Sequence, residues 1–426
     1  MKRYIKKQTR YKSLTSAKKS RASKSLSRPA LTILAFVSLI FLGALFMANK
    51  NKPNSPPDTN QINEASRQEP PKAAESKTSS LDLAAVGDML PHETITQSAK
   101  TGSGYDYLSL ISPELQASFK KADLRFCNQE APSAASLGVR GYPAFNAPAQ
   151  FPKDLSKFGC NIISTGNNHS SDGGQTGING TLEEWDSLSP LAVSGSNRSQ
   201  QEADKLQIFE KNGIKIGFVA FSQDSNSSPA NTYSVNRLSN TKLLESQIKG
   251  LKSAADVVIV SAHWGTEDSH TVDSLQKKYA QQIADFGADI ILGSGPHVWQ
   301  PYTELTGSTG NKTHTWYSIG NGLNSQTKAD QLFSGVALLK LTKSAEGKVE
   351  ISSPRVLPTY MHYTWSNGVG LAQSQLLGRR DLKWMTLVGS DALISDRNDF
   401  QTTVPQQFDK LKKYLENDKV ELLQAY

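Results

Sequence analysis

The sequence has 426 residues, enough for one large domain or two ordinary ones, and its formal net charge is +8. The charge belongs to the first 28 residues, which hold eleven Lys and Arg and no acidic residue, so the remainder carries −3. A body that binds nucleic acid needs a basic face, so this distribution argues against a nucleic-acid partner.

An uncharged stretch of nineteen residues, 30–48, follows the basic tail. At about 1.5 Å per residue it spans the roughly 30 Å hydrocarbon core of a bilayer. A cleaved signal peptide is the alternative, but the basic segment is long and Phe46 stands where a cleavage site needs a small residue. We therefore predict a single-pass anchor in the cell membrane, with tail 1–29 in the cytoplasm and the main domain extracellular.

Residues 49–79 contain five prolines, many polar residues and no apolar periodicity. Such a segment cannot bury enough apolar surface to fold, and we predict a disordered linker that spaces the following domain from the membrane. The basic tail before the anchor also suits contact with anionic lipid headgroups.

From residue 81 on, short apolar strands alternate with amphipathic helices. The pattern predicts strands at 81–86, 124–127, 161–164, 257–260 and 290–292, and helices at 113–122, 151–158, 177–188, 243–254 and 275–286. Asn212-Gly213 predicts a hairpin between 208–209 and 214–221. This alternation is typical of a mostly parallel sheet that helices cover on both faces.

After His297 the pattern changes to antiparallel-like strands, predicted at 302–305, 315–319, 336–341, 349–351 and 356–363. A fold with two sheets packed in the middle and helices outside accommodates both the segment before His297 and the segment after it. We assign this two-sheet domain to residues 80–365. Residues 366–426 form a predicted C-terminal extension without an interpretable motif, ending in an amphipathic helix at 405–415.

Two cysteines, Cys127 and Cys160, lie in or next to predicted buried strands. Two cysteines do not make a disulfide framework, so reduced core thiols are the expectation. A bridge requires the two strands to be neighbours, which the sequence does not establish.

Polar side chains follow five of the apolar runs, as expected for a site assembled at one edge of an open α/β sheet. They are Asp88, Glu130, Asn168 with His169, His263 and His297. This set of carboxylates, amide and imidazoles suits Mn, Zn or Fe, as one ion or a pair. Each residue also has an ordinary alternative, because short polar residues cap turns, carboxylates lie on surfaces, and buried histidines can be satisfied in the core.

The blocks GDML at 87–90, NQE at 128–130, GNNHSSDGG at 166–174, AHWGTE at 262–267, GSGPHVWQP at 293–301 and YSIGN at 317–321 resemble the CapA family of poly-γ-glutamate capsule biosynthesis proteins. They occur in the family's order over more than half of the chain. The resemblance implies the four-layer α-β-β-α sandwich of metal-dependent phosphatases. It also implies a membrane-anchored protein at the cell surface, with the anionic polymer poly-γ-glutamate and a synthetase complex as partners.

By the same resemblance, Asp88, Glu130, Asn168, His263 and His297 are metal ligands, and His169 and Asn168 act on the reacting group. The last block departs from the family's Gly-x-His-Pro-His, because Gly295 stands in place of the first histidine. Glycine offers no ligand atom in its side chain, so a metal pair would be reduced or lost. His270, His314 and His92 are less favoured candidates for the missing ligand, and an ordinary polar role is the simpler expectation for each. The sequence around His362 does not indicate a role for it.

Three functions are compatible with these observations. The first is an extracellular metal-dependent hydrolase or transferase acting on phosphoester, amide or polyglutamyl bonds, which the donor set favours. The second is a non-catalytic, polymer-binding accessory subunit with a degenerate metal site, which Gly295 favours. The third is a surface sensor or adhesion protein that uses an enzyme-like fold.

Overall fold

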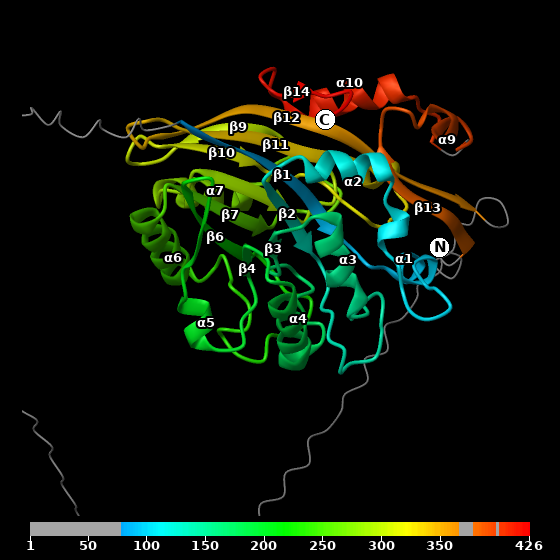
Figure 1. The fold of residues 1–426 in the computed structure, drawn as a ribbon, viewed down its shortest axis with the longest axis horizontal. Helices are drawn as coiled ribbons and strands as arrows, with labels where there is room; N and C mark the ends of the chain where they lie inside the picture. The colour runs from blue at the N-terminus through cyan, green and yellow to red at the C-terminus, as the bar shows by residue number, and fades with distance from the viewer. Residues whose placement is uncertain (1–77, 366–377, 398–399) are drawn as a thin grey trace, which may run out of the picture. The chain divides into compact units, whose positions relative to one another are not determined.

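The computed structural model describes residues 78–365, 378–397 and 400–426, which form two β-sheets and the helices around them (Figure 1). The predicted cytoplasmic tail, the anchor at 30–48 and nearly all of the predicted linker lie outside these ranges. Within them, no helix combines the length and the apolar character needed to cross a membrane.

The larger sheet combines a parallel half with an antiparallel half. Its order is β13 (Arg379–Thr386), β12 (Val349–Trp365), β11 (Phe333–Lys343), β1 (Ser79–Met89), β2 (Leu124–Gln129), β3 (Ile162–Ser164) and β4 (Ala192–Ser194), and β14 (Glu421–Leu422) pairs with β12. Strands β1 to β4 are parallel, whereas β11, β12 and β13 pair antiparallel. The carboxyl ends of β1, β2 and β3 therefore lie at one edge of this sheet.

The smaller sheet is arranged in the same way. Its order is β5 (Gln207–Lys211), β6 (Ile214–Ser222), β7 (Val257–His263), β8 (Ile290–Ser294), β10 (Lys312–Trp316) and β9 (Tyr302–Thr306). Strands β6, β7, β8 and β10 are parallel, and β5 and β9 pair antiparallel at the two edges. The predicted turn is confirmed, because Asn212 and Gly213 connect β5 to β6 with positive φ angles of 47° and 75°.

Side chains that alternate along each strand fill the space between the two sheets. Leu81, Leu83 and Ala85 of β1 point into this inner core, whereas Ala84 and Val86 belong to the outer one. Phe126 and Phe218 meet across the sheets at a ring-centroid distance of 6.1 Å. The period-2 pattern therefore gives each sheet two buried faces.

Helices surround the two sheets. They are α1 (Glu93–Ser98), α2 (Pro113–Lys120), α3 (Gln150–Phe158), α4 (Gly174–Leu188), α5 (Gln200–Asp204), α6 (Thr241–Ala254), α7 (Ser274–Asp285), α8 (Ala329–Leu332), α9 (Asp391–Ser395) and α10 (Val404–Leu415), with a 3₁₀ helix at Leu108–Leu110. Helices α2 and α3 share the outer core of the larger sheet, and α6 and α7 that of the smaller sheet. The described part is thus a mixed α/β fold in which the two sheets lie between layers of helices (Figure 1).

Some elements differ from the predicted ones. The strand expected at 315–319 is found at Lys312–Trp316, and the next three residues are buried beyond its end. The two strands expected at 349–351 and 356–363 are one long strand, β12. Strands β13 and β14 lie in the segment set apart as an extension, yet both pair with β12, so the C-terminal part belongs to the same compact unit as the sheets.

Cys127 and Cys160 form a disulfide, so the expectation of reduced thiols is wrong. Strands β2 and β3 are neighbours in the larger sheet, with Cys127 beside Ile163. Cys160 lies two residues before β3, and its Cα is 5.8 Å from that of Cys127. This is the adjacency that the sequence alone did not establish.

Candidate metal centre

Asp88 lies where β1 breaks its regular pairing with β2. The register shifts between Val86 and Asp88, which places Asp88 beside Asn128. A Cβ on the intervening Gly87 would lie 1.8 Å from the carbonyl oxygen of Gly320, so only glycine fits this approach. The Asp88 N–H donates to that carbonyl at 3.1 Å. The motif glycine therefore positions the carboxylate that follows it.

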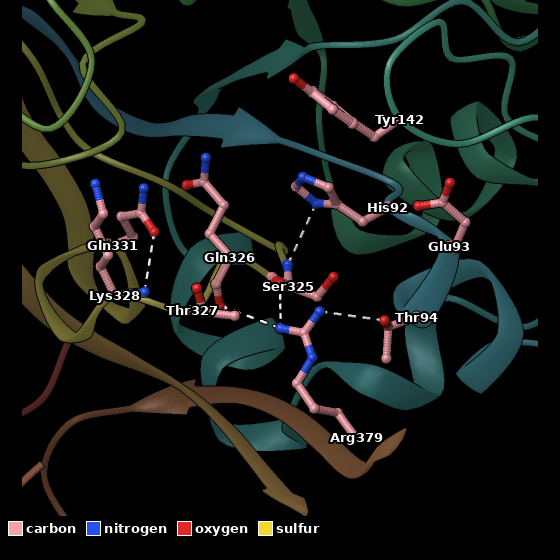
Figure 2. A pocket seen from close by; sticks show the side chains of 10 residues that line it. All are labelled: His92, Glu93, Thr94, Tyr142, Ser325, Gln326, Thr327, Lys328, Gln331 and Arg379. Carbon is pink, nitrogen blue, oxygen red and sulfur yellow. Dashed lines mark hydrogen bonds between the residues drawn. The ribbon is translucent and has the colours of Figure 1, made fainter. Parts of the chain in front are cut away.

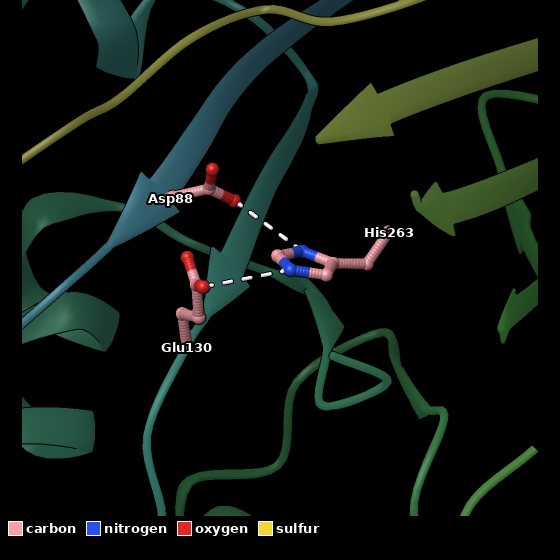
Figure 3. Close-up of side chains that lie close together, drawn as sticks. All are labelled: Asp88, Glu130 and His263. Carbon is pink, nitrogen blue, oxygen red and sulfur yellow. Dashed lines mark ion pairs between the residues drawn. The ribbon is translucent and has the colours of Figure 1, made fainter. Parts of the chain in front are cut away.

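Asp88, Glu130 and His263 form a buried group with one potential ligand atom each, and these atoms all lie within 4.8 Å of one another. His263 lies between the carboxylates, with its Nδ1 3.7 Å from Asp88 Oδ1 and its Nε2 3.5 Å from Glu130 Oε1 (Figure 3). The residues come from the ends of β1, β2 and β7, so both sheets contribute to the group. Two carboxylates and an imidazole are a donor set for Mn, Zn or Fe.

Glu130 is the most informative member of the group. Its side chain is fully buried, and neither carboxylate oxygen has a hydrogen-bond partner among the described residues. Burial, followed by the negative charge of Asp88, raises the pKa of Glu130 well above its usual value. A buried carboxylate without partners is costly, and a cation between it and His263 would remove that cost.

His297 approaches the same group from the loop after β8. Its Nδ1 lies 3.0 Å from Asp88 Oδ2 and 3.1 Å from Asn321 Oδ1, so Nδ1 carries the proton and Nε2 faces Glu130 Oε1 at 3.9 Å. The backbone of His297 has φ = 61°, an unusual conformation for a residue other than glycine. Such strain is typical of functional positions.

The pKa values follow from this geometry. Burial favours a neutral Asp88, but the hydrogen bond and charge of His297 outweigh burial and lower the pKa of Asp88 to about 2. Burial lowers the pKa of His297, but the hydrogen bonds to Asp88 and Asn321 and the negative charges of Asp88 and Glu267 together outweigh burial and raise it. Burial lowers the pKa of His263 to about 4, which leaves its imidazole neutral, as metal binding requires.

Asn168 and His169 lie beside this group in different surroundings. Asn168 and His263 line a cleft of about 160 Å³, and the Asn168 side-chain oxygen is buried without a hydrogen-bond partner among the described residues. His169 belongs to a second cluster, with its Nδ1 2.7 Å from Asp172 Oδ2 and its Nε2 3.3 Å from the Asn226 amide. The Asn226 N–H donates to the Asn168 carbonyl at 2.7 Å, which joins the two residues to this cluster.

Gly295 occupies a restricted position. Its N–H donates to Asp88 Oδ2 at 3.2 Å, and its φ is +108°. A Cβ there would lie 2.5 Å from the carbonyl oxygen of Trp264 and 3.3 Å from His263 Nε2. A histidine at this position would therefore be directed at the buried group only after the backbone had shifted.

The other candidate histidines do not replace the missing one. His270 contacts the Trp299 carbonyl at 2.7 Å and Asp330 at 3.2 Å. His314 hydrogen-bonds the Tyr302 hydroxyl at 2.6 Å. The remaining two lie elsewhere, His92 against Ser325 and Phe145 and His362 against Tyr360.

Four polar residues that sequence reasoning did not assign support the buried group. They are Asn128, Asn167, Ser294 and Asn321. The Asn128 amide donates to Asp88 Oδ1 at 2.7 Å, and Ser294 Oγ lies 2.9 Å from His263 Nδ1. All four lie inside the sequence blocks that carried the family resemblance, so the sequence did mark their surroundings as part of the site. A block alone does not show which of its residues contacts a ligand and which supports another side chain.

Similarity to known proteins agrees with the sequence blocks. PGA biosynthesis protein CapA of Bacillus subtilis (strain 168) is 26% identical over 298 residues, covering 68% of this chain and 75% of the relative. Capsule biosynthesis protein CapA of Bacillus anthracis is 26% identical over 183 residues, covering 41% and 43%. Among solved structures, the Haemophilus influenzae NAD nucleotidase NadN aligns with 14% identity and a TM-score of 0.42, over 82% of this chain and 58% of NadN.

The model of the family described as "Bacterial capsule synthesis protein PGA_cap" matches residues 82–326, which contain the buried group, its supporting residues and the six sequence blocks. The match covers more than half of the sequence. The resemblance to CapA proteins is therefore confirmed, and the chain belongs to the bacterial capsule synthesis protein family PGA_cap.

Proposed function

We propose that this protein is a membrane-anchored enzyme of capsule or poly-γ-glutamate biosynthesis or export, with a metal-dependent hydrolase site at the ends of β1, β2 and β7. The observation that carries the proposal is the buried carboxylate of Glu130, which has no hydrogen-bond partner among the described residues and lies 3.5 Å from a neutral imidazole. The two curated relatives are named for capsule and PGA biosynthesis, which supports the biological setting.

The donor set fits a divalent cation. Asp88, Glu130 and His263 would hold it. Further donors nearby are the Nε2 atom of His297 and the side-chain oxygen of Asn168, which has no partner among the residues that the structure describes. When bound, such a cation supplies Lewis acidity and neutralises negative charge. Asp88 also accepts from His297 Nδ1, and so it orients that ring while it contributes its own charge to the group.

His169 is placed to handle a proton. Asp172 accepts from its Nδ1 at 2.7 Å and fixes the tautomer of the ring, so Nε2, which lies 3.3 Å from the Asn226 amide, is the atom that would exchange a proton with substrate. Phe145 packs edge-on against the ring at a centroid distance of 4.7 Å and limits its rotation. Asn168 lines the adjoining cleft, where its amide would orient the reacting group.

The cell-surface location has two supports. Residues 30–48 have the length and composition of a membrane anchor, with a strongly basic segment before them. The Cys127–Cys160 disulfide is typical of a domain that folds outside the reducing cytoplasm. In this setting, the polymer and a synthetase complex at the membrane are the proposed partners.

The activity is tested by assaying the full-length protein, supplied with Mn²⁺, Zn²⁺ or Fe²⁺, against p-nitrophenyl phosphate, bis-p-nitrophenyl phosphate and a γ-glutamyl p-nitroanilide. We expect one of these to be hydrolysed, and we expect Glu130→Gln to abolish the activity because it removes a charge at nearly constant volume. Glu350→Gln, at an exposed position on β12, is the matched control and should be fully active. Equal activity of Glu130→Gln and the wild type would refute the enzymatic proposal.

A second function, that of a non-catalytic accessory subunit, is favoured by Gly295, which stands where the family pattern has a histidine. The two are distinguished in cells that depend on the protein for capsule formation. If Asp88→Ala/His169→Ala at normal surface levels restores capsule, the protein acts as an accessory subunit. If this double variant fails while Glu350→Gln succeeds, the site is needed.

A further inference from the structure

A second pocket, larger than the cleft over the buried group, lies between the loops that follow β1 and Asn321. Its volume is about 650 Å³, which is in the range of pockets for small molecules. Its wall includes His92, Glu93, Tyr142, Gln326, Lys328 and Arg379 (Figure 2). Polar side chains predominate, so the pocket differs from an unfilled gap in the apolar core.

Several polar atoms at the pocket wall lack a partner among the described residues. Ser325 is 2% exposed, and its buried hydroxyl has no hydrogen-bond partner within the described part of the chain. The Gln326 side-chain oxygen accepts from Asn321 at 2.7 Å, which leaves its NH₂ group available. The Ser325 N–H donates to His92 Nδ1 at 3.4 Å, so His92 Nε2 carries a proton and is a donor. The wall thus offers donors from an amide and an imidazole.

The charged side chains at the pocket wall differ in whether a ligand could pair with them. Lys328 forms an ion pair with Asp268. Arg379 is 4% exposed and donates to the carbonyls of Ser325 and Gln326 and to Thr94, so it serves as part of the pocket floor. Glu93 has no ion pair or hydrogen bond among the described residues. Among the charged side chains of the described wall, Glu93 is therefore the one that is neither ion-paired like Lys328 nor buried like Arg379.

Glu93 and the aromatic ring of Tyr142 border the same part of the pocket. A Cβ on Gly141 would lie 2.1 Å from a Glu93 carboxylate oxygen, so this carboxylate packs against the backbone beside Tyr142. Tyr142 is 59% exposed, which makes it one of the few large side chains with an open face among the described residues. An accessible ring next to a carboxylate suits a ligand with one apolar face and several polar groups around its edge.

These features separate the classes of ligand. A phosphate or carboxylate group would meet the unpaired charge of Glu93, which is unfavourable. An ammonium group would leave the amide and imidazole donors unpaired, since it has no acceptor. Hydroxyl groups both donate and accept, and so they can satisfy Glu93 and the donors together. We propose that this pocket binds a neutral, hydroxyl-rich sugar unit, with the ring face against Tyr142 and hydroxyls on Glu93 and Gln326.

The pocket adjoins the buried group. Asn321 contacts both, because its side-chain oxygen lies 3.1 Å from His297 Nδ1 and its NH₂ donates to Gln326. His92 packs edge-on against Phe145, which contacts His169 in the same way. A sugar in this pocket would lie one side chain away from the proposed site of chemistry. The proposal goes beyond the proposed function, and it does not require a bound metal.

The test is isothermal titration calorimetry of the full-length protein in a detergent without a sugar headgroup. The probes are maltotriose and triacetylchitotriose, with trialanine amide as a neutral peptide and hexa-γ-glutamate as an anion. We expect at least one trisaccharide to bind, with a loss of affinity of fivefold or more, on the order of 1 kcal/mol, in Glu93→Gln and in Tyr142→Ala. Tyr142→Phe keeps the ring and should bind as the wild type does, and Glu346→Gln, at a fully exposed position, is the control for charge.

Three results would overturn the proposal: neither trisaccharide binds, binding is unchanged in both Glu93→Gln and Tyr142→Ala, or the peptide or the anion binds more tightly than the sugars. The variant His263→Ala separates this proposal from the metal centre. It should lose metal and retain sugar binding, so failure of one proposal is visible without failure of the other.

Discussion

The disulfide between Cys127 and Cys160 gives a stability prediction whose size can be worked out. The bond closes a loop of 33 residues, and the chain-entropy relation for a loop of that length gives about 4 kcal/mol of stabilisation at 25 °C. An unfolding entropy of about 2.1 cal/mol/K per residue over about 350 residues converts this to a fall in Tm of about 5 °C. We therefore expect Cys127→Ala/Cys160→Ala to unfold about 5 °C below the wild type.

The assay is thermal unfolding followed by circular dichroism, with urea unfolding as a second measurement. The sequence contains no other cysteine, so thiol exchange with a third residue cannot complicate the comparison. Hydrogen bonds between β2 and β3 persist in the variant, and metal content should therefore stay unchanged. Equal stability of the variant and the oxidised wild type, or two free thiols per chain in the untreated wild type, would refute the reasoning.

Three further predictions concern the site. Metal affinity should fall as the pH is lowered, by up to about tenfold per pH unit for each proton displaced. The raised pKa of Glu130 means that a cation must displace the proton of that carboxyl group. Calorimetry at several pH values measures this, and a flat profile contradicts it. Gly295→Ala should lower the free energy of unfolding, measured in urea, by about 1–3 kcal/mol, because its Cβ would lie 2.5 Å from a carbonyl oxygen. The decrease should be larger than in Gly310→Ala, where φ is also positive but no atom lies near the added Cβ. Asp172→Asn should lower kcat by about tenfold or more without loss of metal, since it removes the carboxylate that accepts from His169 Nδ1 and fixes the tautomer of that ring; an unchanged rate would assign that pair a structural role.

Much of the fold was predictable because apolar residues recur at different intervals in strands and in helices. The short apolar runs before Asp88, Asn128 and His263 predicted parallel strands, and each is a buried strand in the structure. The antiparallel half was predicted less well. Strand β12 is continuous through residues 349–365 because both neighbours hold it, and that support comes from distant segments that a local pattern does not reveal.

The buried group was also partly predictable. The glycine-flanked blocks indicated Asp88, Glu130 and His263, and the structure brings these three together. Sequence spacing could not place His169, which shares its contacts with Asp172 and a loop after β6 and not with the two carboxylates. The sequence also did not predict the disulfide between the two cysteines, because that bond depends on which strands are neighbours in the sheet.

The central claim, that Asp88, Glu130 and His263 hold a divalent cation, is tested most directly by metal analysis of the full-length protein purified without chelator. We predict at least one ion of Mn, Zn or Fe per chain in the wild type and in Glu350→Gln, and loss of that ion in His263→Ala and Glu130→Gln. A metal content near zero in the wild type, or an equal content in all four proteins, would contradict the claim.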